Sequence, residues 1–272
     1  MKEMKFSVII PTTLKRSSVF KTINSITNQS FKDFEIILST NKKNINENLK
    51  KKIDIGIKII QLSKLGLAHA RNEGIKEAKG EIISFLDDDA IADESWLSNL
   101  VKSFSKSSIG IVGGPIYPIW PKNGIKSIKN SNLAKEWLSL IEISEKKIFI
   151  DRVFGCNFSV KKKIFQEFGL FNTQLGRKNG GFLGGEDTEF CNRINKKYKI
   201  LYNPDVKVSH LIDSERLTLK WIYKRAYYGG YSKAFQKKLP KRLSQKNRFN
   251  LFDFTLLFPY FIGYFKGILE GL

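Results

Sequence analysis

Three consecutive aspartates, Asp87, Asp88 and Asp89, directly follow the apolar stretch 81–86. Neighbouring carboxylates repel one another unless a cation neutralises them, and Mg²⁺ and Mn²⁺ prefer carboxylate and phosphate oxygens. Because side chains alternate along an extended strand end, we expect Asp87 and Asp89 to point the same way. The triplet therefore predicts either a divalent cation site or a solvated acidic turn that caps the next helix.

A second acidic pair, Glu186 and Asp187, follows the stretch 176–185, which contains five glycines. Such a stretch is too flexible for the interior of a helix or strand, so it predicts either a lid that orders when a ligand binds or a plain loop. The pair itself is typical of the acidic first turn of a helix, where the helix dipole favours carboxylates.

The first 112 residues must position the aspartate triplet, and they alternate short apolar runs with helical patterns. The pattern predicts strands over 6–10, 34–38, 57–62 and 81–86, and helices over 19–27, 67–78 and 96–104. Strands that alternate with helices indicate a parallel sheet with right-handed crossovers. Ligands bind beyond the carboxyl ends of the strands of such sheets, and the triplet lies at one of these ends. The middle of the chain is less regular, with a predicted helix over 133–143 and strands over 153–160 and 206–209.

Several short segments, in this order along the chain, resemble family 2 glycosyltransferases. They are 7–12 (SVIIPT), 29–37 (QSFKDFEII), 66–74 (GLAHARNEG), 82–89 (IISFLDDD), 155–161 (GCNFSVK), 168–171 (FGLF) and 185–189 (GEDTE). The resemblance covers roughly residues 5–212. It implies an α/β fold of the GT-A type, with a Rossmann-like, mostly parallel sheet, helices on both faces and a helical C-terminal extension.

The resemblance also implies three parts of the chain. Residues 1–112 would form the nucleotide-sugar-binding half, 113–213 the acceptor-binding half of the same domain, and 214–272 a basic, aromatic C-terminal extension. The implied activity is that of an inverting, hexosyltransferase-like enzyme. It would move a sugar from a nucleotide diphosphate to the hydroxyl of a glycan or glycolipid acceptor, in cell-envelope, exopolysaccharide or glycolipid assembly.

The same resemblance implies roles for individual residues. The donor-binding residues would be Pro11, Thr12, Asn41, Arg71, Asp87 and Asp88. The ligands of an Mn²⁺ or Mg²⁺ cofactor would be Asp89, Asp87 and His210. The catalytic residues would be the general base Asp187 and its neighbour Glu186, and the acceptor side would hold Cys156, Asn157 and Gly185. Two of these residues keep structural alternatives, namely a buried ion pair for Arg71 and a packing role for His210.

The chain departs from the family after the second predicted strand. Many members carry an aspartate there that binds the nucleotide base, whereas residues 38–42 of this chain are LSTNK. Ser39, Thr40 or Asn41 could donate or accept a hydrogen bond at a base edge, but the carboxylate acceptor is missing. The inference to a uracil nucleotide is therefore weakened.

The net charge is +21, and residues 214–272 carry 12 Lys and Arg against 3 Asp and Glu. Such a surface attracts polyanions, which leaves a basic protein that binds nucleic acid or membranes as a non-enzymatic alternative. The chain has no recognised nucleic-acid-binding motif, so no specific nucleic acid is expected. The other alternative, a sugar nucleotidyltransferase, would carry a glycine-rich loop after the first strand, where this chain has residues 11–16, PTTLKR.

The longest uncharged stretch of the extension, 254–265, has 12 residues with Pro259 inside, which is too short to cross a bilayer. The alternatives are an anchor on an anionic membrane surface or a helical pair packed on the catalytic domain.

Two cysteines form no disulfide framework or zinc site, and no leader pattern precedes the first strand. We therefore expect a cytoplasmic protein, peripheral on the cytoplasmic face of the membrane if the anchor forms.

Overall fold

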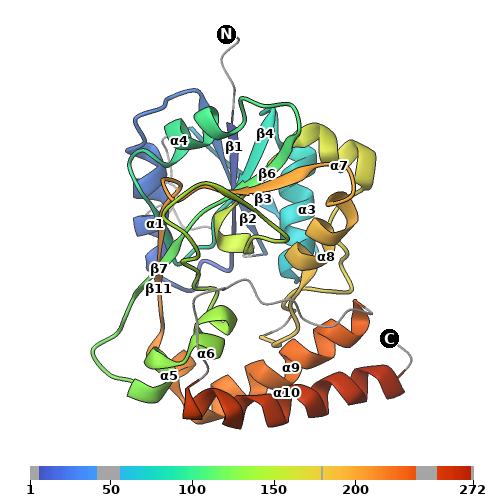
Figure 1. Ribbon diagram of the computed structural model, residues 1–272. Coiled ribbons are helices and arrows are strands. Elements are labelled where there is room, and N and C mark those ends of the chain that lie inside the picture. The colour runs from blue at the N-terminus through green and yellow to red at the C-terminus, as the bar shows by residue number, and fades with distance from the viewer. Residues whose placement is uncertain (1–5, 42–55, 179, 237–249, 271–272) are drawn as a thin grey trace.

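The computed structural model describes residues 6–41, 56–178, 180–236 and 250–270 (Figure 1). Its largest element is an eight-stranded sheet with the strand order β3-β2-β1-β4-β9-β6-β10-β8. These strands are β1 (Phe6–Thr12), β2 (Phe34–Thr40), β3 (Ile57–Gln61), β4 (Ile82–Phe85), β6 (Ile109–Gly113), β8 (Ile148–Ile150), β9 (Phe158–Lys161) and β10 (Lys199–Tyr202). β1 pairs in parallel with β2 and β4, whereas β8 and β9 run antiparallel to their neighbours. The expected mostly parallel α/β sheet is confirmed.

Helices cover both faces of this sheet. Strand β1 shows the reason, because its successive side chains point to opposite faces: Val8 and Ile10 belong to one core and Ile9 to the other. The first core includes side chains of α1 (Ser18–Thr27) and α4 (Trp96–Ser103). The second core includes side chains of α3 (Leu67–Glu77), α7 (Lys162–Phe168) and α8 (Glu186–Ile194).

A smaller sheet of three strands lies beside the main one, with the order β5-β11-β7. It consists of β5 (Ala90–Ala92), β7 (Ile116–Ile119) and β11 (Val208–Leu211). The antiparallel pairing of β11 with β5 sets His210 opposite Ala90. This sheet therefore carries the histidine to the residue that follows the aspartate triplet.

The middle of the chain differs from the sequence-based expectation in two elements. The helix predicted over 133–143 is present only in its first half, as α6 (Asn132–Trp137), which follows a short helix that was not predicted, α5 (Lys126–Asn130). The chain turns at Ser139, which has a φ of 61°, and Ile141 then bridges to Ile116 in the smaller sheet. The predicted strand over 153–160 begins instead with a 3₁₀ turn, η1 (Gly155–Asn157), before β9. Tertiary pairing decides both segments, because neither has a strong periodic pattern of its own.

The C-terminal extension forms a second 3₁₀ turn, η2 (Ser214–Leu217), and two helices that run parallel to each other, α9 (Leu219–Phe235) and α10 (Leu251–Leu269), which lie beneath the main sheet in Figure 1. Asn250 and Asp253 form a capping box that starts α10. The two helices touch at glycines: a Cβ on Gly263 would lie 1.9 Å from the carbonyl oxygen of Tyr227. Among the residues that the structure describes, no helix is long and apolar enough to cross a bilayer.

Candidate active site

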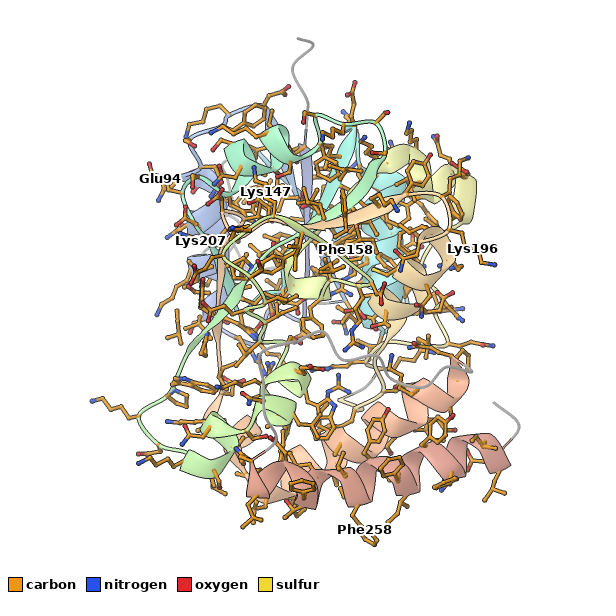
Figure 2. All side chains as sticks on the ribbon, viewed as in Figure 1. Glu94, Lys147, Phe158, Lys196, Lys207 and Phe258 are labelled. Carbon is orange, nitrogen blue, oxygen red and sulfur yellow. The ribbon has the colours of Figure 1, made fainter. Side chains whose placement is uncertain are left out.

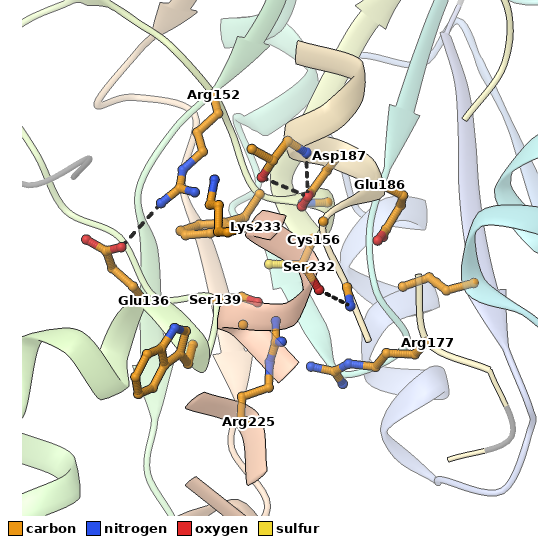
Figure 3. Close-up of a pocket in the computed structure, with 18 of the residues that line it drawn as sticks. Glu136, Ser139, Arg152, Cys156, Arg177, Glu186, Asp187, Arg225, Ser232 and Lys233 are labelled. Atoms are coloured by element: carbon orange, nitrogen blue, oxygen red, sulfur yellow. Dashed lines mark hydrogen bonds and ion pairs between the residues drawn. The ribbon is translucent and has the colours of Figure 1, made fainter. Parts of the chain in front are cut away.

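A cavity of about 340 Å³ opens between the carboxyl end of β4 and the C-terminal helices (Figure 3). Arg71 of α3 and Asp87, which follows β4, line one part of it, and Glu186 and Asp187 line it from the first turn of α8. The opposite wall comes from α6, α9 and α10, so segments from all three predicted parts of the chain meet in this cavity. The aspartate triplet, through Asp87, and the acidic pair Glu186 and Asp187 therefore line the same cavity.

Arg71 joins these two acidic motifs. It is 1% exposed, and its Nη1 lies 2.6 Å from Oε1 of Glu186 while its Nη2 lies 3.0 Å from Oδ1 of Asp87. Burial by itself lowers the pKa of Arg71, but the nearby carboxylates of Asp87, Glu186 and Asp187 outweigh it and raise that pKa. The buried ion pair considered for Arg71 is thus present, and it fixes the distance between the two motifs.

The three aspartates of the triplet point to different partners. The chain leaves β4 in a turn closed by the hydrogen bond from the Ala90 N–H to the Asp87 carbonyl, so the strand alternation expected at 87–89 does not apply. Of the three, Asp87 alone lines the cavity. Asp88 accepts a hydrogen bond from Thr12 Oγ1 at 2.6 Å, and burial raises its pKa to about 6, helped by the charges of Asp89 and Asp87.

Asp89 is 4% exposed and lies among cationic groups. Its Oδ2 accepts hydrogen bonds from Arg16 at 2.6 Å and Arg216 at 2.9 Å, and its Oδ1 lies 3.1 Å from Nε2 of His210. Burial opposes ionisation, yet His210, Arg216 and Arg16 together hold the pKa of Asp89 well below its usual range. Asp89 is therefore an anion at neutral pH. His210 is 2% exposed, and its Nδ1 lies 3.1 Å from the carbonyl oxygen of Leu138.

Carboxylate oxygens of Asp87 and Asp89 and an imidazole nitrogen of His210 are suitable ligands for Mn²⁺ or Mg²⁺. In the described part of the chain no three His, Cys, Asp or Glu side chains already converge as a complete metal site. Ions of this class are commonly held by one or two carboxylates, with phosphate oxygens of the substrate completing the coordination. The residues suit such a shared site, in which the cation would take the place of both Arg16 and Arg216 as the partner of Asp89.

The acidic pair at the start of α8 has two different environments. Gly185, in the left-handed conformation with φ 98°, sets the direction of the helix. Glu186 is 4% exposed, and burial together with the charge of Asp187 raises its pKa. Asp187 is held by backbone groups, since its Oδ2 accepts from the Gly155 N–H at 2.9 Å and its Oδ1 from the Thr188 N–H at 2.6 Å. Asp187 thus presents a fixed carboxylate at the cavity wall.

The structure separates the three residues expected on the acceptor side. Cys156 and Gly185 line the cavity. Asn157 does not; its Oδ1 accepts from Trp96 Nε1 at 3.0 Å and its Nδ2 donates to the Val206 carbonyl at 2.8 Å. These bonds tie Asn157 to Trp96 and to the backbone, and its expected contact with the acceptor stays a prediction.

The remaining donor-side candidates lie apart from the cavity, at the carboxyl ends of the first two strands. Pro11 and Thr12 end β1, and Asn41 follows β2 and is half-buried. None of the three is among the residues that line the cavity. The sequence also predicts a solvated loop and helix over 41–52, of which the structure describes Asn41 alone.

Sequence patterns identified Arg71 but missed the other arginines of the site. Arg16 and Arg216 contact Asp89, Arg152 pairs with Glu136, and Arg177 and Arg225 also line the cavity; these residues are spread from position 16 to position 225. No sequence motif contains these arginines, and the only related signal in the sequence is the positive net charge of the chain.

The model of the family described as Glycosyl transferase family 2 matches residues 7–169. A glucosyl-dolichyl phosphate glucuronosyltransferase of Haloferax volcanii is 25% identical over 281 residues, which cover 98% of this chain and 88% of the relative. A GalNAc(5)-diNAcBac-PP-undecaprenol beta-1,3-glucosyltransferase of Campylobacter jejuni is 32% identical over 204 residues, which cover 71% of this chain but only 60% of the relative.

Among solved structures, a mannosyltransferase from Pyrobaculum calidifontis in complex with GDP-Man and Mn²⁺ matches with a TM-score of 0.63. The match has 18% sequence identity and covers 89% of this chain and 67% of that one. At this identity the likeness bears on the fold alone, and it confirms the expected GT-A fold.

Proposed function

Since the chain belongs to glycosyl transferase family 2, we propose that its cavity is the site where a sugar passes from a nucleotide diphosphate to an acceptor hydroxyl, with inversion at the anomeric carbon. The observation that carries this proposal is the buried Arg71, which joins Asp87 on the donor side to Glu186 beside the candidate base. Neither a nucleotidyltransferase nor a nucleic-acid-binding protein is supported by the family match.

In the proposed reaction Asp187 is the general base. Its carboxylate is held by the backbone N–H groups of Gly155 and Thr188, so it is oriented before the substrate binds. It removes the proton of the acceptor hydroxyl while that oxygen attacks the anomeric carbon and the bond to the diphosphate breaks. A single displacement inverts the carbon, and no covalent nucleophile is required. Glu186 acts through Arg71 and positions the guanidinium.

We propose that the side chains of Asp87, Asp89 and His210 bind a divalent cation. The Pyrobaculum mannosyltransferase, which was solved in complex with GDP-Man and Mn²⁺, supports a cation at the donor of a protein with this fold. When bound, Mn²⁺ or Mg²⁺ would neutralise charge on the departing diphosphate. Pro11, Thr12 and Asn41, at the ends of β1 and β2, are the proposed contacts for the nucleoside.

We propose a lipid-linked acceptor because the names of both relatives specify substrates on dolichyl phosphate or undecaprenol. The extension adds support, since α10 exposes a row of apolar side chains at a spacing of three or four residues. They are Leu251, Phe254, Phe258, Phe261, Ile262, Phe265, Ile268 and Leu269. Phe258 is 74% exposed and projects away from the body of the protein (Figure 2).

Helix α10 combines the two alternatives considered for the extension, a membrane-surface anchor and a helix packed on the catalytic domain. Its opposite side packs on the domain, where Leu256 is fully buried and Tyr260 stacks on Trp137. The exposed side offers aromatic residues to the headgroup region, and the basic residues of 214–272 suit an anionic surface. We therefore propose a peripheral protein that binds the cytoplasmic face of the membrane through α10.

Point substitutions test this membrane contact better than truncation, because removing α9 and α10 would strip buried residues from the core. Replacing Phe254, Phe258 and Phe265 with serine should abolish flotation with vesicles that contain anionic lipid, while thermal stability stays unchanged. Replacing the exposed Phe149 of β8, which lies outside the extension, with serine is the control. Equal flotation of the triple variant and the wild type would exclude the α10 contact.

The reaction itself is tested with Asp187→Asn. The amide keeps the size of the side chain but is not a base, so transfer should fall by about 10²- to 10⁴-fold while metal-dependent binding of the nucleotide is retained. Glu189→Gln is the matched control, since Glu189 lies on the same helix but pairs with Arg193. Wild-type turnover of Asp187→Asn would remove Asp187 from the mechanism.

A further inference from the structure

We propose that Arg177 and Arg225 form a subsite for a phosphate group inside the cavity. The inference rests on the proposed function, because that function supplies phosphate esters both on the donor and on a lipid-linked acceptor. Both side chains line the cavity, one from the glycine-rich loop before α8 and the other from α9. Figure 3 shows them extending toward one another below the acidic pair.

The two guanidinium groups have few partners of their own. Within the described part of the chain, the Arg177 side chain makes no hydrogen bond or ion pair, and Arg225 donates only from Nη1 to the carbonyl oxygen of Phe182 at 3.1 Å. The Nε of Arg225 is buried without a partner. Both residues are half-buried, so their remaining donors are not fully solvated either.

Other arginines in the cavity wall are already compensated. Arg71 faces Asp87 and Glu186, and Arg152 lies 3.3 Å from Glu136. No carboxylate of the described residues lies within ion-pair distance of the other two arginines. Burial and the charge of Arg177 lower the pKa of Arg225 to about 10, which still leaves it protonated at neutral pH.

Two like charges held close together in a partly desolvated cavity are costly unless an anion binds between them. Guanidinium groups present paired N–H donors that match phosphate oxygens, so a phosphate is the favoured anion. Gly184 leaves the necessary room, because a Cβ there would lie 3.2 Å from Nη2 of Arg225. The pair therefore has the charge, the donors and the space for one phosphate group.

The position of the pair is compatible with either substrate phosphate. On one side lie Asp87 and the acidic pair, where the donor diphosphate is proposed. On the other side the cavity is lined by Trp137, Leu257 and Tyr260, and the latter two belong to α10, the proposed membrane-facing helix. A diphosphate from the first side and a prenyl phosphate from the second would present the same chemistry to the arginines.

Calorimetric titration with two probes tests the subsite and separates the sources. Inorganic pyrophosphate represents the donor and geranyl phosphate the lipid-linked acceptor, both in EDTA so that no metal contributes. The variants are Arg177→Gln and Arg225→Gln. Lys224→Gln, an exposed neighbour of Arg225 on α9, is the control with the same change in charge.

Each glutamine variant should weaken binding of at least one probe about tenfold or more, since it removes charge-assisted hydrogen bonds, and the control should bind like the wild type. The probe that loses affinity identifies the phosphate. If a glutamine variant does not fold, the corresponding lysine variant, which keeps the charge, should bind with intermediate affinity. The subsite is overturned if the wild type binds neither probe, or if variants and control bind equally. Binding is measured without transfer, so a failure of the proposed reaction would show separately, in Asp187→Asn.

Discussion

A single methyl group at Gly155 is expected to disable the site through Arg71. A Cβ built on Gly155 would lie 2.3, 2.6 and 2.7 Å from Nη2, Nη1 and Cζ of Arg71, far inside ordinary contact distance. Gly155 is not among the glycines with positive φ, so alanine meets no backbone penalty there. The clash itself is therefore the perturbation that Gly155→Ala introduces.

The size of the effect follows from how Arg71 is held. Arg71 is 1% exposed and carries two carboxylate partners, so it cannot move more than an ångström without losing one of them. Overpacking costs about 1–3 kcal/mol and breaking a buried ion pair about 3–5 kcal/mol. Because the two costs are alternative ways of relieving one clash, we expect the free energy of unfolding to fall by about 3 kcal/mol. A shift of Asp187, which Gly155 also anchors, should reduce transfer by about 100-fold.

Urea denaturation and initial rates of transfer measure these two effects. The double variant Gly155→Ala/Arg71→Lys is the internal check, because lysine lacks the planar group that the new methyl meets. Its loss of stability should be smaller than the sum of the single losses by at least about 1 kcal/mol. Strict additivity, or a Gly155→Ala protein within about 0.5 kcal/mol of wild type and fully active, would refute a rigid Arg71.

Three further outcomes are expected. The pKa of Asp88 is raised from 3.8 to about 6 in the folded protein, so the folded state binds this proton more tightly than the unfolded state does. The free energy of unfolding should therefore fall as the pH rises from about 4 through 6, by at most about 3 kcal/mol. Asp88→Asn keeps an acceptor for Thr12, and in EDTA its urea midpoints should lack this fall; an unchanged pH slope contradicts the assignment. Gly263→Ala would press a Cβ against the Tyr227 carbonyl and separate α9 from α10, at a cost of about 1–3 kcal/mol visible as a lower Tm; an unchanged Tm would disprove the close contact. EDTA should stop transfer and added Mn²⁺ should restore it, whereas full activity in EDTA would count against the cation.

The donor half of the fold was predictable because its signals are local. Strand β1 alternates between two cores, and the aspartate triplet follows the apolar β4 directly. The place of the triplet at the carboxyl end of a parallel strand therefore follows from neighbouring residues alone. The acidic first turn of α8 is local in the same sense. Both acidic motifs could therefore be located before any tertiary contact was known.

Tertiary structure alone decided how the motifs are used. The turn at 87–89 sends Asp87 to the cavity and Asp89 to Arg216, a partner 127 residues away, and no spacing rule describes such a contact. Asn157, which the family motif placed on the acceptor side, lies in η1 and bonds to Trp96 and to the carbonyl of Val206, partners 61 and 49 residues away. Sequence periodicity reports which face of an element is apolar. It does not report which element packs on that face. In this protein, the packing of the elements decides which charged residues meet in the cavity.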